Sequence, residues 1–94
     1  MRDPGATYRV QVPDAAEREL DRLPIKVIRQ IRGVIEALKT DPRPHGCKKL
    51  KGQKPELWRV YSGRYRILYS IDDAAKTVWI TNVGHRKDVY RGLP

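Results

Sequence analysis

The sequence predicts an α+β domain in the order βααβββ, with an antiparallel sheet and two helices packed on one of its faces. Apolar residues recur at helical spacing between residues 14 and 38, and they alternate with polar residues at the two-residue period of a strand between residues 57 and 83. A chain of 94 residues holds one modest core. We therefore expect a single domain over residues 1–94, with residues 1–6 as a loose lead-in.

The N-terminal half should form a short strand and two helices. The strand alternates Tyr8, Val10 and Val12 with polar residues and ends at Pro13. Asp14 and Glu17 have the spacing of a capping box for the first helix, and Leu23-Pro24 is typical of a tight junction between helices. The second helix should end before Asp41-Pro42. It presents an apolar stripe at about 3.6-residue spacing, made of Val27, Ile28, Ile31, Val34, Ile35 and Leu38.

The C-terminal half predicts an antiparallel meander with strands near residues 57–61, 64–71 and 77–83. Ser62-Gly63 is a two-residue hairpin signal, because Gly accepts the positive φ that tight turns need. Residues 42–56 should be a loop and residues 84–94 a short irregular or helical tail. The expected core side of the strands carries Trp58, Val60, Tyr65, Ile67, Tyr69, Ile71, Val78 and Ile80.

The net charge of +9 is concentrated in one half of the chain. Residues 42–94 carry 12 Lys and Arg against 4 Asp and Glu, whereas residues 1–41 carry 8 against 7. A strongly positive surface attracts polyanions, so nucleic acid is the first expected partner and an acidic protein the second. The alternative is that the basic surface only keeps the protein soluble. The loop cations suit phosphate contacts: Lys48, Lys49, Lys51 and Lys54.

The low cysteine count and the absence of a long apolar segment indicate the cellular compartment. Cys47 is the single cysteine, which excludes an internal disulfide and suits a reducing compartment. No apolar run approaches the roughly 20 residues of a membrane span. We expect a cytoplasmic protein without a membrane partner.

The candidate site lies on the predicted strands and in the tail. Arg59 and Tyr61 share one face of a strand, Arg66 faces the same way on its neighbour, and Arg86 and Tyr90 follow the third strand. Clustered guanidinium groups repel each other unless an anion lies among them, and phosphate fits. His85 has the pKa range for acid-base catalysis, although it can equally pack or cap a turn. The two histidines and the single cysteine are too far apart in the sequence to predict a metal site. The sequence also lacks a glycine-rich phosphate-binding loop, so it does not predict a nucleotide cofactor.

The succession LDRLP, KKLKG, LWRVYSGRYRILYSID and VGHRKDVYR resembles the RelE toxin family of type II toxin-antitoxin systems, from about Tyr8 to Arg91. The resemblance implies a compact fold of helices on an antiparallel sheet. It also implies an endoribonuclease that needs no metal or other cofactor and cuts messenger RNA in the ribosomal A site, by attack of the ribose 2′-hydroxyl on the adjacent phosphate. By motif, the resemblance assigns the reaction to Arg59, Arg66, Arg86 and Tyr90.

The chain departs from the family pattern two positions after Arg59, where Tyr61 stands in place of a frequent Lys or Arg. Arg is a poor general base, so Tyr61 or His85 would have to fill that role. Arg64 joins the lysines of the loop as a candidate contact to RNA or the ribosome. The resemblance implies three partners: an acidic antitoxin in a hetero-oligomer, the ribosome and messenger RNA. Two alternatives stay open, a ParE-like inhibitor of DNA gyrase and a nucleic-acid-binding module without catalysis.

Overall fold

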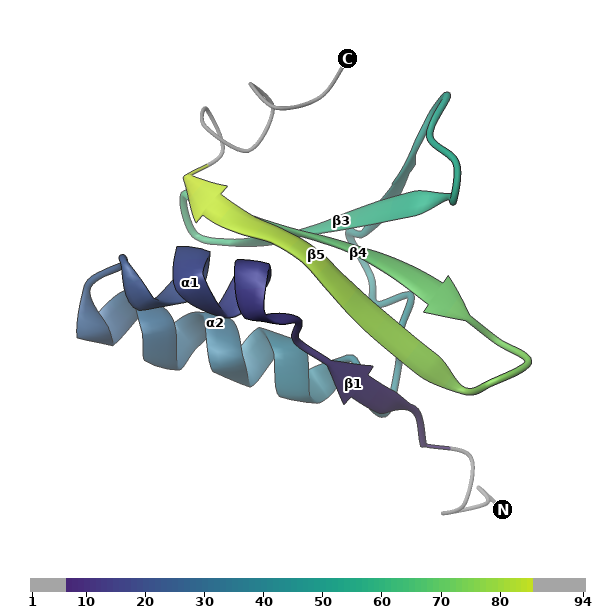
Figure 1. The fold of residues 1–94 in the computed structure, drawn as a ribbon, viewed down its shortest axis with the longest axis horizontal. Helices are drawn as coiled ribbons and strands as arrows, with labels where there is room; N and C mark the ends of the chain where they lie inside the picture. The colour runs from purple at the N-terminus through teal and green to yellow at the C-terminus, as the bar shows by residue number, and fades with distance from the viewer. Residues whose placement is uncertain (1–6, 86–94) are drawn as a thin grey trace.

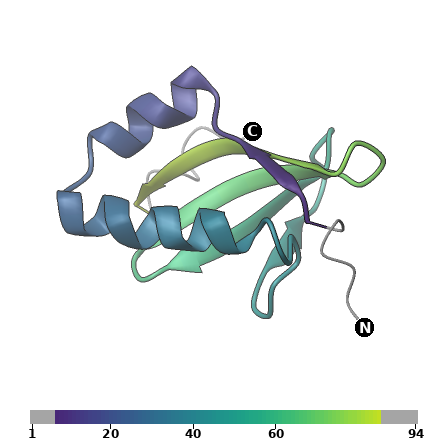
Figure 2. The ribbon, with the colours of Figure 1, turned by 90° about the horizontal axis from the view of Figure 1, so that it is seen from below.

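A computed structural model describes residues 7–85 as a five-stranded sheet with two helices on one side (Figures 1 and 2). The strand order is β1-β5-β4-β3-β2. The predicted α+β class, with both helices on one face, is confirmed. The elements are β1 (Arg9–Gln11), α1 (Asp14–Asp21), α2 (Ile25–Ala37), β2 (Lys48–Leu50), β3 (Leu57–Ser62), β4 (Tyr65–Asp72) and β5 (Thr77–His85).

Each helix begins directly after a proline. Pro13 and Pro24 are the N-caps of α1 and α2, with extended ψ angles of 161° and 148°. The predicted capping box at Asp14 was wrong, because Asp14 is already the first helical residue and α1 has no side-chain cap. Glu17 instead accepts a 2.8 Å hydrogen bond from Arg32 of α2 and so links the two helices. Neither helix within residues 7–85 is long and apolar enough to cross a membrane.

The predicted meander is confirmed, with a shift at its first turn and a last strand that continues to His85, two residues into the predicted tail. β3 pairs antiparallel with β4, and β4 with β5. Ser62 pairs with Tyr65, so the two turn residues are Gly63 and Arg64 rather than Ser62 and Gly63. Gly63 has a φ of 61° at the first turn position, where the type II′ hairpin turn requires a positive φ.

Two features of the sheet differ from the sequence prediction. β2, within the predicted loop, pairs antiparallel with β3 and forms an edge of the sheet. Its three residues, two of them lysines, are too few to show alternation. β1 joins β5 in parallel, so the sheet is mixed rather than wholly antiparallel.

The core lies between the helices and one face of the sheet. The predicted sheet residues all belong to it: Val60, Ile67, Tyr69, Val78 and Ile80 are buried, and Trp58, Tyr65 and Ile71 pack against them. The helices contribute Ala16, Leu20, Ile31 and Ile35, with Leu38 directly after α2. Burial of these apolar surfaces fixes which face of β3 and β4 points away from the helices, and on that face Leu68, opposite Arg59, is buried as well. We call it the open face.

Three segments far apart in the chain meet at Asp73, in the turn between β4 and β5. The Tyr8 hydroxyl donates to Oδ1 of Asp73 at 2.6 Å, and Nη2 of Arg43 donates to Oδ2 at 2.8 Å. These two hydrogen bonds, that from Arg43 above all, lower the pKa of Asp73 to about 2. They tie the residue before β1 and the segment after α2 to the turn between β4 and β5.

Candidate nucleic-acid interface

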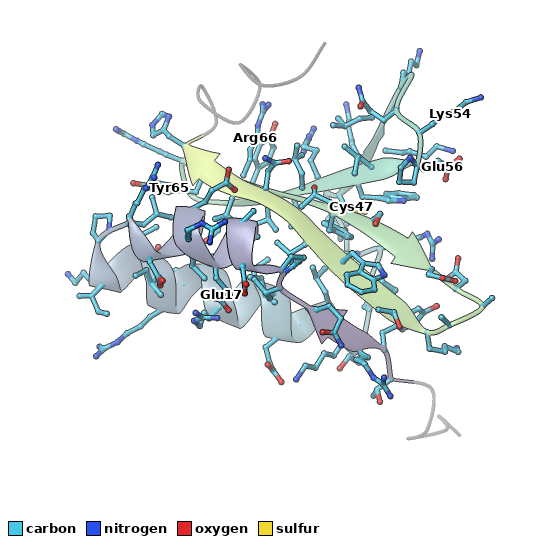
Figure 3. All side chains as sticks on the ribbon, in the orientation of Figure 1. Glu17, Cys47, Lys54, Glu56, Tyr65 and Arg66 are labelled. Carbon is cyan, nitrogen blue, oxygen red and sulfur yellow. The ribbon has the colours of Figure 1, made fainter. Side chains whose placement is uncertain are left out.

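The open face of the sheet carries Arg59, Tyr61 and Arg66 close together. Tyr61 of β3 lies directly opposite Arg66 of β4 in the antiparallel register. The next pair, Val60 and Ile67, is buried on the helix side. Because side chains alternate along a strand, Arg59, Tyr61 and Arg66 point away from the helices, as predicted. Figure 3 shows Arg66 among the polar side chains of this part of the sheet.

Tyr61 lies between two guanidinium groups. The Cζ atom of Arg59 is 4.1 Å from the centroid of the Tyr61 ring, and that of Arg66 is 5.0 Å away. Nη2 of Arg66 also donates a 2.9 Å hydrogen bond to the Tyr61 hydroxyl oxygen. The cation-π contacts hold both cations beside an exposed ring. The arrangement offers positive charge, a stacking surface and a hydroxyl group at one place.

The predicted binding cations divide between several parts of the molecule. Lys48 pairs with Arg59 across β2 and β3 and so extends the open-face cluster. Lys49 pairs with Trp58, on the other face, and forms a 3.4 Å ion pair with Glu56. Lys51 and Lys54 lie in the connection before β3, and Arg64 lies in the turn after β3, so they are at opposite ends of this strand. Figure 3 shows Lys54 and Glu56 on the first of these connections.

The structure does not bring His85 to this cluster. His85 pairs with Tyr65, and the two rings meet edge to face with their centroids 5.6 Å apart. Tyr65 packs against the core, so His85 lies on the helix side of the sheet. There it lines a depression with Glu19, Leu23, Pro24 and Val83, among others. The alternative interpretation from the sequence, a packed histidine, fits this placement. Arg86 and Tyr90 lie outside the described residues.

A β-bulge in β5 sets the register of the strand that precedes the tail. Tyr69 pairs with Ile80 but Leu68 pairs with Asn82, so Thr81 is the extra residue, and its hydroxyl donates to the Leu68 carbonyl at 3.0 Å. The bulge turns Val83 into the core, where 4% of its surface is exposed. The sequence analysis missed both features. The sequence signal that could have revealed the bulge is Val83, an apolar residue three positions after Ile80, because a regular strand would place the next core residue two positions after it.

Glu19 of α1 is a second feature that the sequence analysis missed. Its Oε1 accepts a 2.8 Å hydrogen bond from the backbone N–H of Val83, two residues after the bulge. Asn82 donates to its other oxygen at 3.5 Å. A helix residue thus holds β5 in place shortly before the chain enters the GHRKDVY segment.

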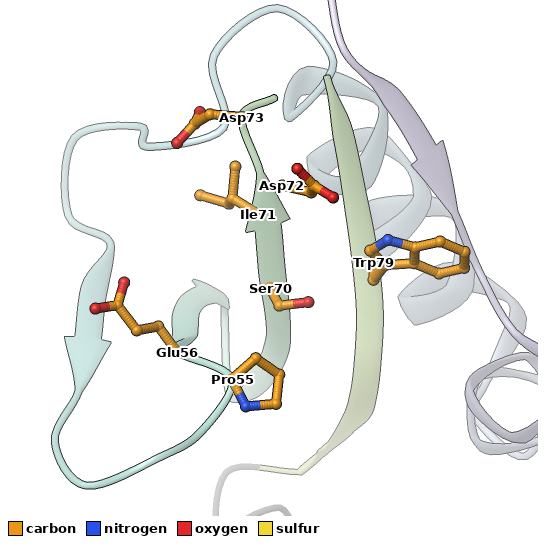
Figure 4. A pocket seen from close by; sticks show the side chains of 7 residues that line it. All are labelled: Pro55, Glu56, Ser70, Ile71, Asp72, Asp73 and Trp79. Carbon is orange, nitrogen blue, oxygen red and sulfur yellow. The ribbon is translucent and has the colours of Figure 1, made fainter. Parts of the chain in front are cut away.

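A further depression, shown in Figure 4, contains none of the predicted site residues. Acidic and apolar side chains and one serine line it, namely Pro55, Glu56, Ser70, Ile71, Asp72, Asp73 and Trp79. Within residues 7–85, no three His, Cys, Asp or Glu side chains come together in a way that would hold a metal ion.

Comparison with known proteins identifies the family. Residues 10–90 match the family model described as ParE toxin of type II toxin-antitoxin system, parDE. Toxin RelG of Mycobacterium tuberculosis is 36% identical over 87 residues, which cover 89% of this chain and 97% of RelG. The crystal structure of the RelBE2 toxin-antitoxin complex from the same organism contains a similar chain, at 31% identity and a TM-score of 0.76, with coverage of 85% of this chain and 99% of that one. The archaeal RelE-RelB complex from Pyrococcus horikoshii OT3 gives 28% identity and a TM-score of 0.75, with 85% and 96% coverage. The chain therefore belongs to the RelE/ParE superfamily and is a toxin of a type II toxin-antitoxin system.

Proposed function

We propose that this toxin is an endoribonuclease that cleaves messenger RNA on the ribosome and thereby inhibits translation. The observation that carries the proposal is the placement of Tyr61 between Arg59 and Arg66 on an open sheet face. A cationic and aromatic surface, with an exposed Tyr61 between two half-buried arginines, suits an extended polyanion. The chain is similar to proteins named Toxin RelG and Toxin RelE, and its resemblance to the RelE family implies a ribonuclease rather than another activity of the superfamily.

The reaction is a transesterification within the RNA. The ribose 2′-oxygen attacks the adjacent phosphorus, the bond to the 5′-oxygen of the next nucleotide breaks, and a 2′,3′-cyclic phosphate and a 5′-hydroxyl result. The proton of the 2′-hydroxyl passes to a water molecule, and a second proton reaches the departing 5′-oxygen. Arg59 and Arg66 stabilise the negative charge that develops on the phosphoryl oxygens.

The hydrogen bond from Arg66 favours Tyr61 as a donor of a proton rather than as an acceptor. Its hydroxyl oxygen accepts from Arg66, so its own proton is available for donation. We therefore assign Tyr61 as proton donor to the departing 5′-oxygen, and not as the general base that the sequence analysis expected. Arg86 is proposed to contact the scissile phosphate, and Tyr90 to stack on a base or to take part in proton transfer. His85 has no part in this mechanism, because its ring lies on the other face of the sheet.

Two kinds of partner follow from this proposal. The RelBE2 and RelE-RelB structures are complexes with an antitoxin, and we propose that this chain likewise binds a cognate acidic antitoxin. The concentration of positive charge in residues 42–94 favours such a partner. The ribosome is the second partner, with Lys48, Lys51, Lys54 and Arg64 as phosphate contacts and Lys49 in a weaker role because of Glu56.

Arg59→Ala tests the site in cells. Arg59 makes one long hydrogen bond, of 3.4 Å, to the Gly46 carbonyl, so its removal should leave the fold intact. We expect induced expression of the variant to lose growth inhibition and message cleavage. Arg29→Ala is the matched control, because it removes the same charge from an exposed position on α2. Full toxicity of Arg59→Ala, or equal losses in both variants, would contradict the assigned site.

Inhibition of DNA gyrase is a second candidate function. The observation that favours it is the match to the family model described as ParE toxin. It predicts intact messages after induction, together with loss of supercoiling by purified gyrase.

A further inference from the structure

Trp79 is an exposed aromatic residue on the same sheet face as the Arg59, Tyr61 and Arg66 cluster. Its neighbours in sequence, Val78 and Ile80, are fully buried on the helix side, so Trp79 points to the open face. Across the sheet it pairs with Ser70 of β4 and Gln11 of β1. In residues 7–85, Tyr61 and Trp79 are the exposed large apolar or aromatic side chains of the sheet, at 39% and 45% exposure.

The surroundings of Trp79 suit a flat ligand better than a protein partner. Its cross-strand neighbours are polar, so it does not belong to a contiguous apolar patch of the kind that marks protein interfaces. Figure 4 shows Trp79 at the border of the depression that also contains Ser70. An exposed aromatic ring offers a flat π-face on which nucleic-acid bases can stack.

The carboxylates near Trp79 are largely engaged in other contacts. Asp73 is bound by Arg43 and Tyr8, and Glu56 forms its ion pair with Lys49. Asp72 accepts a 3.0 Å hydrogen bond from the Ala75 N–H. This end of the face thus offers stacking without the positive charge of the Arg59 and Arg66 end. Binding at Trp79 should therefore depend little on salt.

We propose that Trp79 is a second base-stacking platform, on which a nucleotide outside the scissile step rests while single-stranded RNA crosses the open face. Ser70, the cross-strand partner of Trp79, follows Arg66 by four residues on β4, which corresponds to about 13 Å along the strand. The two contacts therefore engage different nucleotides. This inference rests on the proposed function only in that RNA is the ligand of this face.

The test measures binding of a fluorescent single-stranded oligoadenylate with 2′-O-methyl sugars, which cannot undergo the proposed cleavage. Anisotropy is recorded for the full chain over a range of salt concentrations. Trp79→Ala should weaken binding about 5- to 150-fold, the usual effect of losing one stacked base. Its salt slope should equal that of the wild type, whereas Arg59→Ala should reduce the slope. Trp79→Phe should retain most of the affinity, because it keeps a flat ring.

Two controls keep the result interpretable. Ile25→Ala removes another exposed apolar side chain, on α2, and should bind as the wild type. Trp79→Thr replaces the ring by a good strand former, so it reports on stacking if the alanine variant does not fold.

The outcomes separate this inference from the proposed function. Wild-type binding by Trp79→Ala or Trp79→Thr, or no binding by the wild type itself, would overturn the stacking platform. Unchanged oligonucleotide binding with loss of antitoxin capture would make Trp79 a protein contact instead. If Trp79 is needed for binding but the wild type cleaves no message, the platform stands and the ribonuclease proposal falls.

Discussion

The hydroxyl oxygen of Tyr61 accepts a 2.9 Å hydrogen bond from Nη2 of Arg66, the residue directly opposite it on the neighbouring strand. Arg59, two residues before Tyr61, places its guanidinium 4.1 Å from the same ring. The position where the family pattern often has a cation thus holds a phenol that two cations contact. Positive charge and a proton donor are thereby combined on adjacent strands.

Tyr61→Phe should abolish most of the RNA cleavage without disturbing the fold. The ring and its cation-π contacts to both guanidinium groups remain, and the variant loses the hydroxyl group, which is both the proton donor and the acceptor of the Arg66 hydrogen bond. Loss of a general acid typically lowers the rate by about 10²- to 10⁴-fold. Single-turnover cleavage on programmed ribosomes measures this effect. Tyr65→Phe makes the same chemical change on the helix side of the sheet and should cleave normally. Unchanged cleavage by Tyr61→Phe would reduce Tyr61 to a stacking role.

Glu19→Ala should destabilise the protein by about 1 to 3 kcal/mol, because the buried N–H of Val83 loses its acceptor. Glu19→Gln keeps an oxygen at that place and should cost less. Urea denaturation gives the free energies of unfolding. Glu17→Ala is the matched control, since its exposed ion pair with Arg32 is worth at most about 1 kcal/mol. An equal effect of the two alanine variants would show that Glu19 does not anchor β5.

Asp73→Asn should remove an acid-dependent part of the stability. The folded-state pKa of Asp73 is lowered from 3.8 to about 2, so the carboxylate stabilises the fold above the unfolded-state pKa. That contribution is lost as the pH falls from about 4 through 2. Thermal melting at a series of pH values should therefore show a difference between wild type and variant at neutral pH that shrinks across this window. A difference independent of pH would exclude the proposed linkage.

The structure could be predicted where apolar residues recur at the regular spacing of a strand or a helix. Val60, Ile67 and Val78 follow the period of a buried strand face, and Ile31 and Ile35 follow that of a helix. β2 could not be predicted, because three residues that pair only through their backbone leave no side-chain pattern. The parallel partner of β1 depends on the path of the whole chain, which local spacing does not record.

The candidate site was predictable where it lies on regular strands. Arg59, Tyr61 and Arg66 come together because period-two alternation fixes their face once the core face is known. The direction of His85 was left open by the sequence, and it lies on the other face because the extra residue Thr81 reverses the alternation before β5 ends. The Glu19 contact to Val83 joins residues 64 positions apart, and no spacing rule connects them.

The central claim is that this toxin cuts messenger RNA with the help of the ribosome. Residues 7–85 offer cations and a phenol on an open face, and alignment of the 2′-hydroxyl with its phosphate can be worth several kcal/mol of the barrier. The ribosome can supply that alignment. The most direct measurement maps the 5′ ends of a defined message after incubation with the purified toxin, with and without programmed ribosomes. The account predicts new 5′ ends at A-site codons only when ribosomes are present. Equal cleavage of the free message, or intact messages in both samples, would contradict it.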